Sequence, residues 1–469
     1  MRMTSAVPDA SVAFNPGSYR DPAGRVFERN GELFRSVAEI AKDDYELLMT
    51  SGLYEELSSM GLLVCHEEVS VPEVAAYKIL KPQRIPFVSY PHEWSFSQLK
   101  AAALLTLRIQ RLAMKRGLSL KDATAFNVQF YGARAVFIDT LSFERYQEGR
   151  PWVAYRQFCE QFLAPLALMA RCDVRLNELL RSFIDGVPLD VARSILGVRG
   201  WISPGLAVHV MLHAGLQRRY ADAAAVTSSE RVAAAKVSKR SLEGMLESLR
   251  NTVKKLSYRA VGTEWGDYYG ATNYSDTGMQ AKGALVERFI QQVRPITVWD
   301  LGANTGRFSA IAAKYASFVL ACDIDPAAVE KLFLSAKKIK EQVILPIRMD
   351  LANPTSGYGW GGQERCSLEQ RGPVDCVLAL ALIHHLAIGR NVPLEQVAEY
   401  FSRLAKYLII EFVPKADSQV QRLLATREDV FPRYDVDGFT EAFSAFFDVV
   451  DSGAVVDSER IVFLLRRRP

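Results

Sequence analysis

From Thr297 to the end of the chain, short apolar runs alternate with longer stretches in which apolar positions recur every three to four residues. Short apolar runs are typical of buried strands, and the longer period is typical of amphipathic helices. Strands that alternate with helices predict a parallel sheet with crossover helices. We therefore expect residues 258–469 to form an α/β domain.

The first half of the chain has a different pattern. Two short strand-like pieces flank Asn30-Gly31, a dipeptide that tolerates the positive φ angles of a tight hairpin. Residues 21–215 are therefore expected to form an α+β domain. Helical periodicity and one strand pair are predicted further along this region, the helices at 43–60, 95–116, 152–183 and 204–225 and the strand pair near 126–139.

Two segments outside these domains lack a clear core-forming pattern. Residues 1–20 contain proline, serine and glycine without periodicity, and we expect a mobile leader there. Residues 216–257 are rich in alanine, serine and charged side chains, which predicts an exposed helical linker.

Composition narrows the class of protein. The chain has 469 residues, long enough for two or three domains, and its net charge of +4 is too small to indicate a nucleic-acid surface. Its six cysteines are scattered without metal-site spacing, which fits a reducing cytoplasm and predicts no metal site. No apolar stretch approaches the roughly 18 residues needed to span a bilayer, so neither export nor membrane insertion is expected.

A glycine-containing loop follows the first predicted strand of the α/β domain. The segment 298–309, VWDLGANTGRFS, places Asp300 at the strand end and Gly302, Asn304 and Gly306 in the loop. Glycine permits a tight turn and a close approach of backbone to ligand, and the next helix presents unpaired N–H groups. The loop therefore predicts a nucleotide-like ligand, although asparagine at position 304 departs from the GxGxxG pattern of dinucleotide-binding loops.

The next two predicted strands also end in acids. Asp323 follows the loop by about 20 residues, where a doubly wound fold places a carboxylate against ribose hydroxyls. Asp350 ends the third strand and is expected near an adenine amine. Asp325-Pro326 has the sequence of a helix start, so we interpret Asp325 as a capping residue.

Further polar groups follow the fourth and fifth strands. The apolar run from Val374 ends in His384 and His385, and the strand after it carries Glu411. An imidazole or carboxylate there can accept a proton from a hydroxyl or amine. A packing role for the histidines, and a salt bridge or cap for Glu411, are equally open interpretations.

Taken together, these motifs resemble the class I S-adenosylmethionine-dependent methyltransferases: DLGANTG matches the first motif, and ALIHHL matches the segment after strand four. The resemblance implies a Rossmann-like, seven-stranded sheet whose last hairpin, formed by 446–450 and 461–465, runs in reverse. It also implies S-adenosylmethionine lying across Gly302, Asp323 and Asp350. Aromatic residues before the first motif are expected to form a lid or to pack in the core; they are Trp265, Tyr268, Tyr269 and Tyr274.

One spacing in the first half is similar to a protein-kinase catalytic loop. Asp122 is followed five positions later by Asn127 and, beyond a predicted hairpin, by Asp139. The kinase pattern is incomplete, because no His-Arg precedes Asp122, no glycine-rich loop is evident and Lys78 is a weak candidate for the nucleotide lysine. Residues 21–215 are thus a degenerate kinase-like scaffold, an active phosphotransferase or an unrelated α+β domain.

The pairing of the two halves resembles a bacterial family that includes rhizobial host-specific nodulation proteins, on softer segments such as YPHEWSFSQLK. That resemblance implies methylation of a saccharide or signal-molecule precursor in host interaction. A small metabolite or a protein remains open as acceptor, and so does a regulatory protein that binds the cofactor without turnover. The sequence indicates no oligomeric state.

Overall fold

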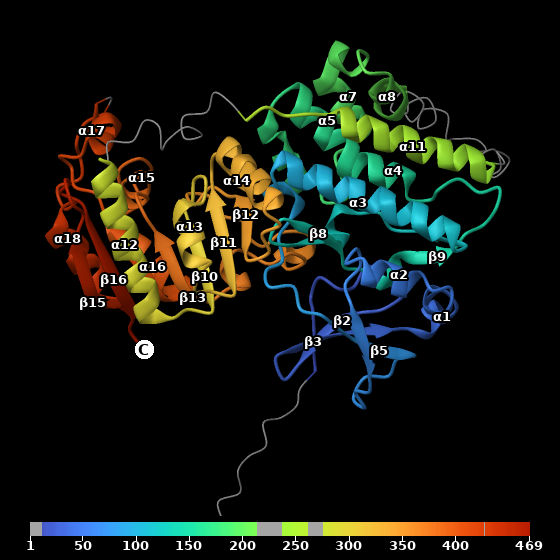
Figure 1. Ribbon diagram of the computed structural model, residues 1–469, viewed down its shortest axis with the longest axis horizontal. Coiled ribbons are helices and arrows are strands. Elements are labelled where there is room, and N and C mark those ends of the chain that lie inside the picture. Colours follow the sequence, from blue (N-terminus) through green and yellow to red (C-terminus); the bar gives the residue numbers. More distant parts are fainter. Residues whose placement is uncertain (1–11, 213–236, 261–274, 426) are drawn as a thin grey trace, which may run out of the picture.

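A computed structural model of the chain describes residues 12–212, 237–260, 275–425 and 427–469 (Figure 1). Within these ranges no helix combines the length and apolar character required to cross a membrane. The two halves of the chain lie side by side, with helix α14 and strands β11 and β12 of the second half facing the first half (Figure 1).

The second half is built on a seven-stranded sheet, as predicted. Its spatial order is β12-β11-β10-β13-β14-β16-β15. The first five strands in this order are parallel, and β16 runs antiparallel to both of its neighbours. The strands in chain order are β10 (Thr297–Leu301), β11 (Phe318–Asp323), β12 (Ile344–Arg348), β13 (Val374–Ala379), β14 (Ala405–Phe412), β15 (Phe447–Ala454) and β16 (Ile461–Arg467).

Helices connect the strands and pack on the sheet. Strand β11 is buried along its whole length, as expected for a parallel strand that is covered on both faces. Helix α14 begins at the capping residue Asp325, whose carboxylate accepts bonds from the N–H groups of Ala327 and Ala328, which confirms the predicted cap. The helices of this half are α12 (Asp276–Val293), α13 (Arg307–Ala312), α14 (Pro326–Lys338), α15 (Ile383–Ala387), α16 (Leu394–Leu404), α17 (Ser418–Leu424) and α18 (Val436–Ser444).

The first half contains a five-stranded antiparallel sheet in the order β1-β2-β3-β5-β4. The predicted hairpin joins β2 to β3, with Asn30 and Gly31 both at positive φ. The predicted strand pair near 126–139 is the hairpin β7–β8. The strands are β1 (Ala13–Phe14), β2 (Val26–Arg29), β3 (Glu32–Val37), β4 (His66–Val69), β5 (Lys78–Pro82), β6 (Leu118–Leu120), β7 (Val128–Tyr131), β8 (Arg134–Phe137) and β9 (Phe143–Arg145).

Helices make up most of the remainder of this half. The longest is α3, which begins at Ser95 with a capping box closed by Gln98. The helices are α1 (Lys42–Thr50), α2 (Leu53–Ser59), α3 (Phe96–Lys115), α4 (Tyr155–Phe158), α5 (Ala164–Arg171), α6 (Leu179–Ser182), α7 (Leu189–Leu196), α8 (Pro204–Leu206) and α11 (Lys239–Lys255).

Two predicted segments make more contacts in the described residues than their composition indicated. Within the expected leader, Ala13–Phe14 pairs with β2 and Arg20 forms an ion pair with Glu364. The expected linker helix is packed along one side. Helix α11 buries one apolar side of the helix, formed by Leu242, Leu246, Leu249 and Val253, and it lies along α3.

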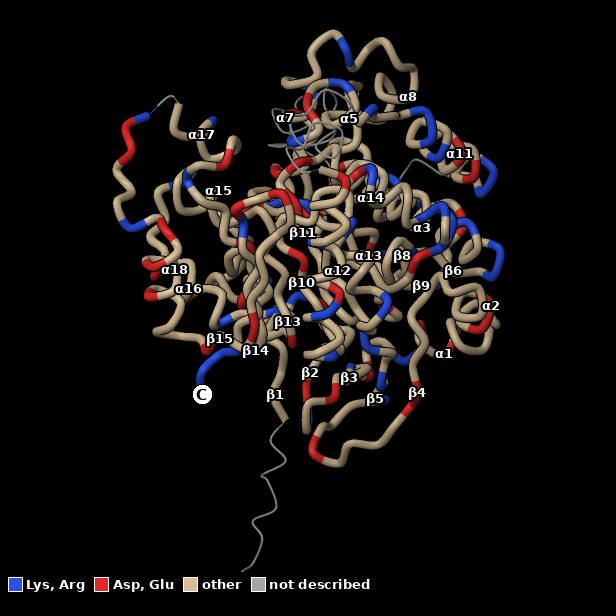
Figure 2. Tube along the Cα trace, turned by 60° about the vertical axis from the view of Figure 1, so that its left-hand side comes forward, with Lys and Arg blue, Asp and Glu red and all other residues tan. Residues whose placement is uncertain are grey.

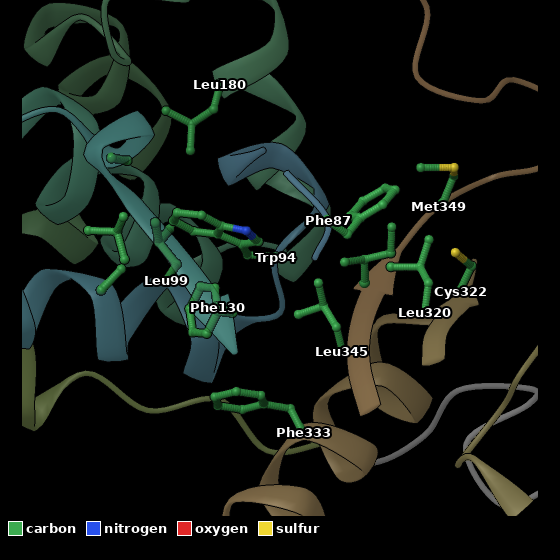
Figure 3. Packing of buried hydrophobic residues seen from close by; sticks show 14 of the residues in the cluster. Phe87, Trp94, Leu99, Phe130, Leu180, Leu320, Cys322, Phe333, Leu345 and Met349 are labelled. Carbon is green, nitrogen blue, oxygen red and sulfur yellow. The ribbon is translucent and has the colours of Figure 1, made fainter. Parts of the chain in front are cut away.

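One buried cluster joins the two halves (Figure 3). Phe87 lies edge-on against Trp299 of β10, with ring centroids 5.7 Å apart. Phe130 of β7 lies edge-on against Phe333 of α14 at 6.1 Å. Burial of such aromatic surface is a dominant stabilising term. The first half therefore packs against β10 and α14 of the part of the sheet that carries the predicted cofactor loop.

Candidate cofactor site

The loop after β10 holds three residues in left-handed backbone conformations. The φ angles are 88° at Gly302, 49° at Asn304 and 84° at Gly306. The N–H groups of Gly302 and Ala303 both donate to the carbonyl of Cys322 at 2.8 Å, which fixes the loop to the neighbouring strand. Glycine suits these φ values, and a β-carbon at Gly306 would also lie 2.5 Å from Leu332.

Asp323 ends β11 beside this loop. One carboxylate oxygen accepts the N–H of Asn304 at 2.7 Å, and the other accepts the N–H of Asp325 at 2.8 Å. Burial raises the pKa of Asp323 to about 6, and these two backbone bonds oppose the shift. The carboxylate is thus held rigidly at the carboxyl edge of the sheet, where open α/β folds bind ligands.

A cavity of about 380 Å³ opens at this edge. Its volume lies in the range typical of small-molecule sites. The predicted residues Gly302, Asn304, Asp323, Asp350 and His385 all line it. The other lining residues in the described part of the chain are mainly apolar, namely Met279, Lys282, Phe308, Ile324, Met349, Leu351, Ala352, Leu380, Ala381, Leu382, Leu386, Gly389, Arg390 and Leu423.

Two of the predicted cofactor residues lie behind the cavity wall. Asp300 is buried and accepts a hydrogen bond from the hydroxyl of Ser309 at 2.6 Å. Burial raises the pKa of Asp300 to about 7, against the opposing effect of the Ser309 bond. Gly306 begins α13 and packs on Leu332. Both residues shape the loop and are not among the lining residues.

Asp350 follows β12, the strand next to β11, and also lines the cavity. One carboxylate oxygen accepts the N–H of Ala352 at 2.9 Å, and the other lies 3.5 Å from the Arg390 guanidinium. Ile324, the residue after Asp323, is exposed and also lines the cavity. Two carboxylates and an apolar side chain that line one cavity are suited to a flat base attached to a hydroxyl-bearing sugar.

His384 and His385 were predicted at the end of the fourth strand, but they lie on the helix that follows it. Strand β13 ends at Ala379, and His384 and His385 belong to α15, with ring centroids 4.1 Å apart. His385 lines the cavity and His384 is buried behind it. Burial lowers the pKa of His385 to about 4 and that of His384 well below its ordinary value. Both rings are therefore neutral at pH 7.

Glu411 near the end of β14 is fully buried and is not among the cavity-lining residues. Its carboxylate lies 2.7 Å from the Lys282 ammonium and 4.0 Å from Arg460. Lys282 itself lines the cavity, 4.9 Å from the centre of the Phe308 ring. Lys282 was not among the predicted site residues, although its position, three residues after Met279 and four before Val286, places it on the buried side of α12.

The predicted aromatic lid residues Trp265, Tyr268, Tyr269 and Tyr274 lie outside the described residues.

In the first half, the structure brings Asp122, Asn127 and Asp139 together. Asn127 donates to the Ser142 hydroxyl at 3.0 Å, and that hydroxyl donates to Asp139. Burial raises the pKa of Asp122, and the nearby Asp139 adds to the shift.

Two ion pairs involve residues of the kinase-like interpretation. Arg35 lies 2.8 Å from Asp139, so a cation of the protein already pairs with this carboxylate. Lys78 pairs with Glu68 at 2.6 Å, and both residues lie on neighbouring strands. No group of three or more His, Cys, Asp or Glu side chains able to hold a metal occurs among residues 12–212, 237–260, 275–425 and 427–469. The kinase-like interpretation stays a prediction.

The strand order, with one reversed strand between β14 and β15, defines the second half as a class I S-adenosylmethionine-dependent methyltransferase fold. No family model matches the chain. It is 36% identical over 459 residues to nodulation protein NoeA of Rhizobium meliloti (strain 1021), covering 96% of this chain and 95% of that protein. The chain belongs to the family of this nodulation protein, as the sequence resemblance predicted.

Two solved structures are also similar over part of the chain. Magnesium protoporphyrin IX methyltransferase from Synechocystis PCC 6803 is 18% identical, covers 43% of this chain and 92% of its own, and has a TM-score of 0.31. N-methyltransferase NodS from Bradyrhizobium japonicum WM9 is 10% identical, covers 42% of this chain and 99% of its own, and has a TM-score of 0.30.

Proposed function

We propose that the protein transfers a methyl group from S-adenosylmethionine to a small acceptor that enters the cavity of the second half. The observation that carries the proposal is the convergence of Gly302, Asp323 and Asp350 on one cavity at the carboxyl edge of a methyltransferase-type sheet. These groups come from three consecutive strands, and each is fixed by bonds to its neighbours.

The residues present fit this cofactor. Asp323 keeps lone pairs for ribose hydroxyls beside the two backbone bonds it already accepts, and Asp350 can accept from an adenine amine. Ile324 supplies an apolar face for the base. Lys282 places an ammonium in the cavity wall, which complements the carboxylate of the amino-acid end. The bound cofactor would supply an electrophilic methyl group.

His385 is our proposed proton acceptor. Its ring lines the cavity, and this position is what supports the role. Burial lowers its pKa to about 4, which keeps the ring neutral at pH 7 and also makes it a weaker base than an exposed histidine. A neutral imidazole can take the proton from a hydroxyl or ammonium acceptor that is aligned with the methyl group. Glu411 then acts through Lys282, by holding the ammonium in place, and His384 supports the ring of His385.

The acceptor that we favour is a saccharide or signal-molecule precursor of bacterial host interaction. Support comes from membership in a nodulation-protein family.

We further infer that the protein works in the cytoplasm, where the cofactor is made, and that its six cysteines remain reduced there. A cofactor-binding regulator without turnover is the second candidate, because every described group that fits the cofactor would also serve binding alone.

Calorimetric titration of the full chain with S-adenosylmethionine tests the proposal. Asp350→Ala should weaken binding about tenfold to a hundredfold, because a hydrogen bond to a charged group is lost. Asp437→Ala, at an exposed position in the first turn of α18, is the matched control and should bind like the native chain. Absence of binding by the native chain would refute the proposal.

Turnover separates the two candidates. The native chain is incubated with methyl-labelled cofactor and fractionated saccharide precursors, and transfer of label is followed. His385→Gln should bind the cofactor normally and lose about a hundredfold or more in rate, as expected for loss of a proton acceptor. Cofactor binding without transfer to any fraction would instead support the regulator.

A further inference from the structure

An exposed apolar surface lies at one end of the first half, far from the cofactor cavity. We call it the apolar tip. It consists of Ile195, Val198, Trp201, Ile202, Val208 and Leu212. Val198 and Ile202 are 80% and 75% exposed, and Trp201 is 48% exposed. Side chains of this size are normally buried, and a contiguous exposed group of them marks an interaction site.

The side chains of the tip come from four segments that neighbour one another in the fold. They are α7 (Leu189–Leu196), the turn Gly197–Gly200, α8 (Pro204–Leu206) and the helical turn Ala207–Leu212. Gly200 lies so close to Met211 that an added β-carbon would be 2.4 Å from the sulfur. These segments therefore pack against one another, and they project at the top of the molecule in both views (Figures 1 and 2).

The described charges around the tip are mainly positive. Residues 189–212 contain Arg193 and Arg199, and their one acid is Asp190 in the first turn of α7. The last turn of α11 adds exposed Lys254 and Lys255, and its Thr252 lies directly beside Gly205 of α8. Figure 2 shows these basic stretches of α11 next to α8.

We infer that the apolar tip docks on the surface of a bilayer that contains anionic phospholipid, without crossing it. Projecting tryptophan and branched aliphatic side chains enter the boundary between headgroups and acyl chains, and tryptophan is favoured at that depth. Surrounding arginine and lysine side chains attract the anionic headgroups. The exposed apolar side chains, with Arg193 and Arg199 beside them and Asp190 as the one acid on α7, fit this partner better than a protein surface of mixed charge.

Vesicle flotation of the full chain tests the inference. The probes are vesicles of phosphatidylcholine alone and vesicles that contain phosphatidylcholine and phosphatidylglycerol in a roughly three-to-one ratio. The native chain should float with the mixed vesicles and bind the neutral ones more weakly. The double variant Trp201→Ser/Ile202→Ser should lower partitioning about tenfold or more.

A matched control removes the same two kinds of side chain elsewhere. Trp360 and Ile40 are 79% and 77% exposed, so Trp360→Ser/Ile40→Ser should float like the native chain. Because Trp201 is half-buried, circular dichroism and thermal unfolding check that its variant is folded. Arg199→Glu, at an exposed position, gives a second test that leaves the apolar tip intact. It should lower binding to mixed vesicles about twenty-fivefold, since each charge near the surface contributes about fivefold.

The inference is overturned if the native chain floats no better with mixed vesicles than without lipid, or if the tip and control variants lose binding equally. It is also overturned if light scattering shows a native oligomer that the tip variant dissociates while vesicles are not bound. That result would assign the tip to a second copy of the chain.

Discussion

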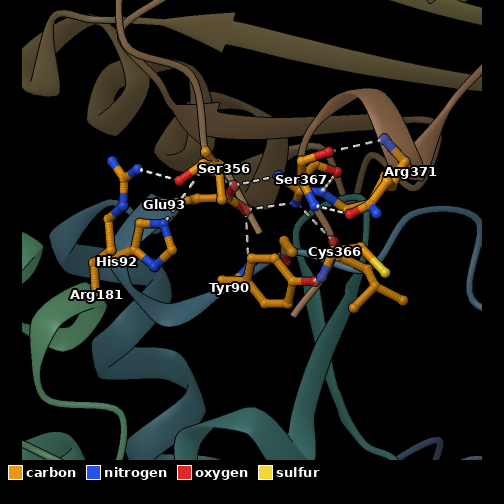
Figure 4. A network of polar contacts seen from close by, with 12 residues as sticks. Tyr90, His92, Glu93, Arg181, Ser356, Cys366, Ser367 and Arg371 are labelled. Carbon is orange, nitrogen blue, oxygen red and sulfur yellow. Dashed lines mark hydrogen bonds and ion pairs between the residues drawn. The ribbon is translucent and has the colours of Figure 1, made fainter. Parts of the chain in front are cut away.

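Removal of Arg371 should destabilise the protein by about 3–5 kcal/mol, because it leaves a buried carboxylate without its cation. Arg371 and Glu93 are 278 residues apart and join the two halves of the chain (Figure 4). Glu93 is almost fully buried and accepts two hydrogen bonds from Arg371, at 2.6 and 2.9 Å. The hydroxyl of Thr355 and the N–H of Tyr90 donate to the same carboxylate.

The charge states support this estimate. Burial raises the pKa of Glu93, and Arg371 more than reverses the shift, so the pKa lies below the ordinary value and the carboxylate is ionised. The guanidinium also lies over the rings of Phe87 and Tyr90, 4.6 and 4.7 Å from their centres. Arg371→Met keeps much of the side-chain volume and removes the charge.

Urea unfolding followed by tryptophan fluorescence and circular dichroism measures the loss, and coincident transitions show whether the halves unfold together. Arg403→Met is the matched control, because Arg403 is half-exposed in its surface pairs with Glu369 and Glu399 and should cost less than about 1 kcal/mol. The double variant Glu93→Gln/Arg371→Met should lose less than the sum of the single losses. A loss for Arg371→Met within about 1 kcal/mol of the control would refute the reasoning.

Two further predictions concern histidine and glycine positions. Burial lowers the pKa of His92 to about 4, so His92 contributes stability above pH 6.5 that is lost as the pH falls, about 1.4 kcal/mol at pH 5.5 in urea titrations. Burial also lowers the pKa of His384, so its effect on stability has the same sign. His92→Gln should flatten this dependence by one proton, and an unchanged slope would contradict it. Gly306→Ala should lower the free energy of unfolding by about 1–3 kcal/mol, because residue 306 has a positive φ and an added β-carbon would lie against Leu332. Gly361 also has a positive φ but faces open space, so Gly361→Ala should lower it less in the same measurement.

The cofactor cavity was largely predictable because its parts are local in sequence. A strand, a glycine-containing loop and a helix start occur within twelve residues, and an acid at a strand end is placed by the sheet itself. Thus Gly302, Asp323 and Asp350 lie together without any long-range information beyond the parallel order of the strands. The capping role of Asp325 was equally local, since Asp-Pro determines it.

The parts that the sequence did not reveal depend on packing between distant segments. From Cys376 to Ile383 the run is apolar without interruption, so its period could not show that the strand ends at Ala379 and that a helix carries the histidines. The composition of α11 indicated a solvated linker, although Leu242, Leu246, Leu249 and Val253 follow helical spacing. The polar composition of this segment led to the linker prediction, although its apolar side chains recur at the spacing of a packed helix.

The contacts between the halves show why the first half bears on the cofactor site. Trp299 precedes Asp300 on β10, and its ring lies against Phe87 of the first half. Phe318, at the start of the strand that ends in Asp323, stacks on the same phenylalanine. The strands that carry the loop and Asp323 therefore rest on Phe87, whose ring lies under the Arg371 guanidinium. Because packed interiors transmit strain, a shift of the first half would move both strands together.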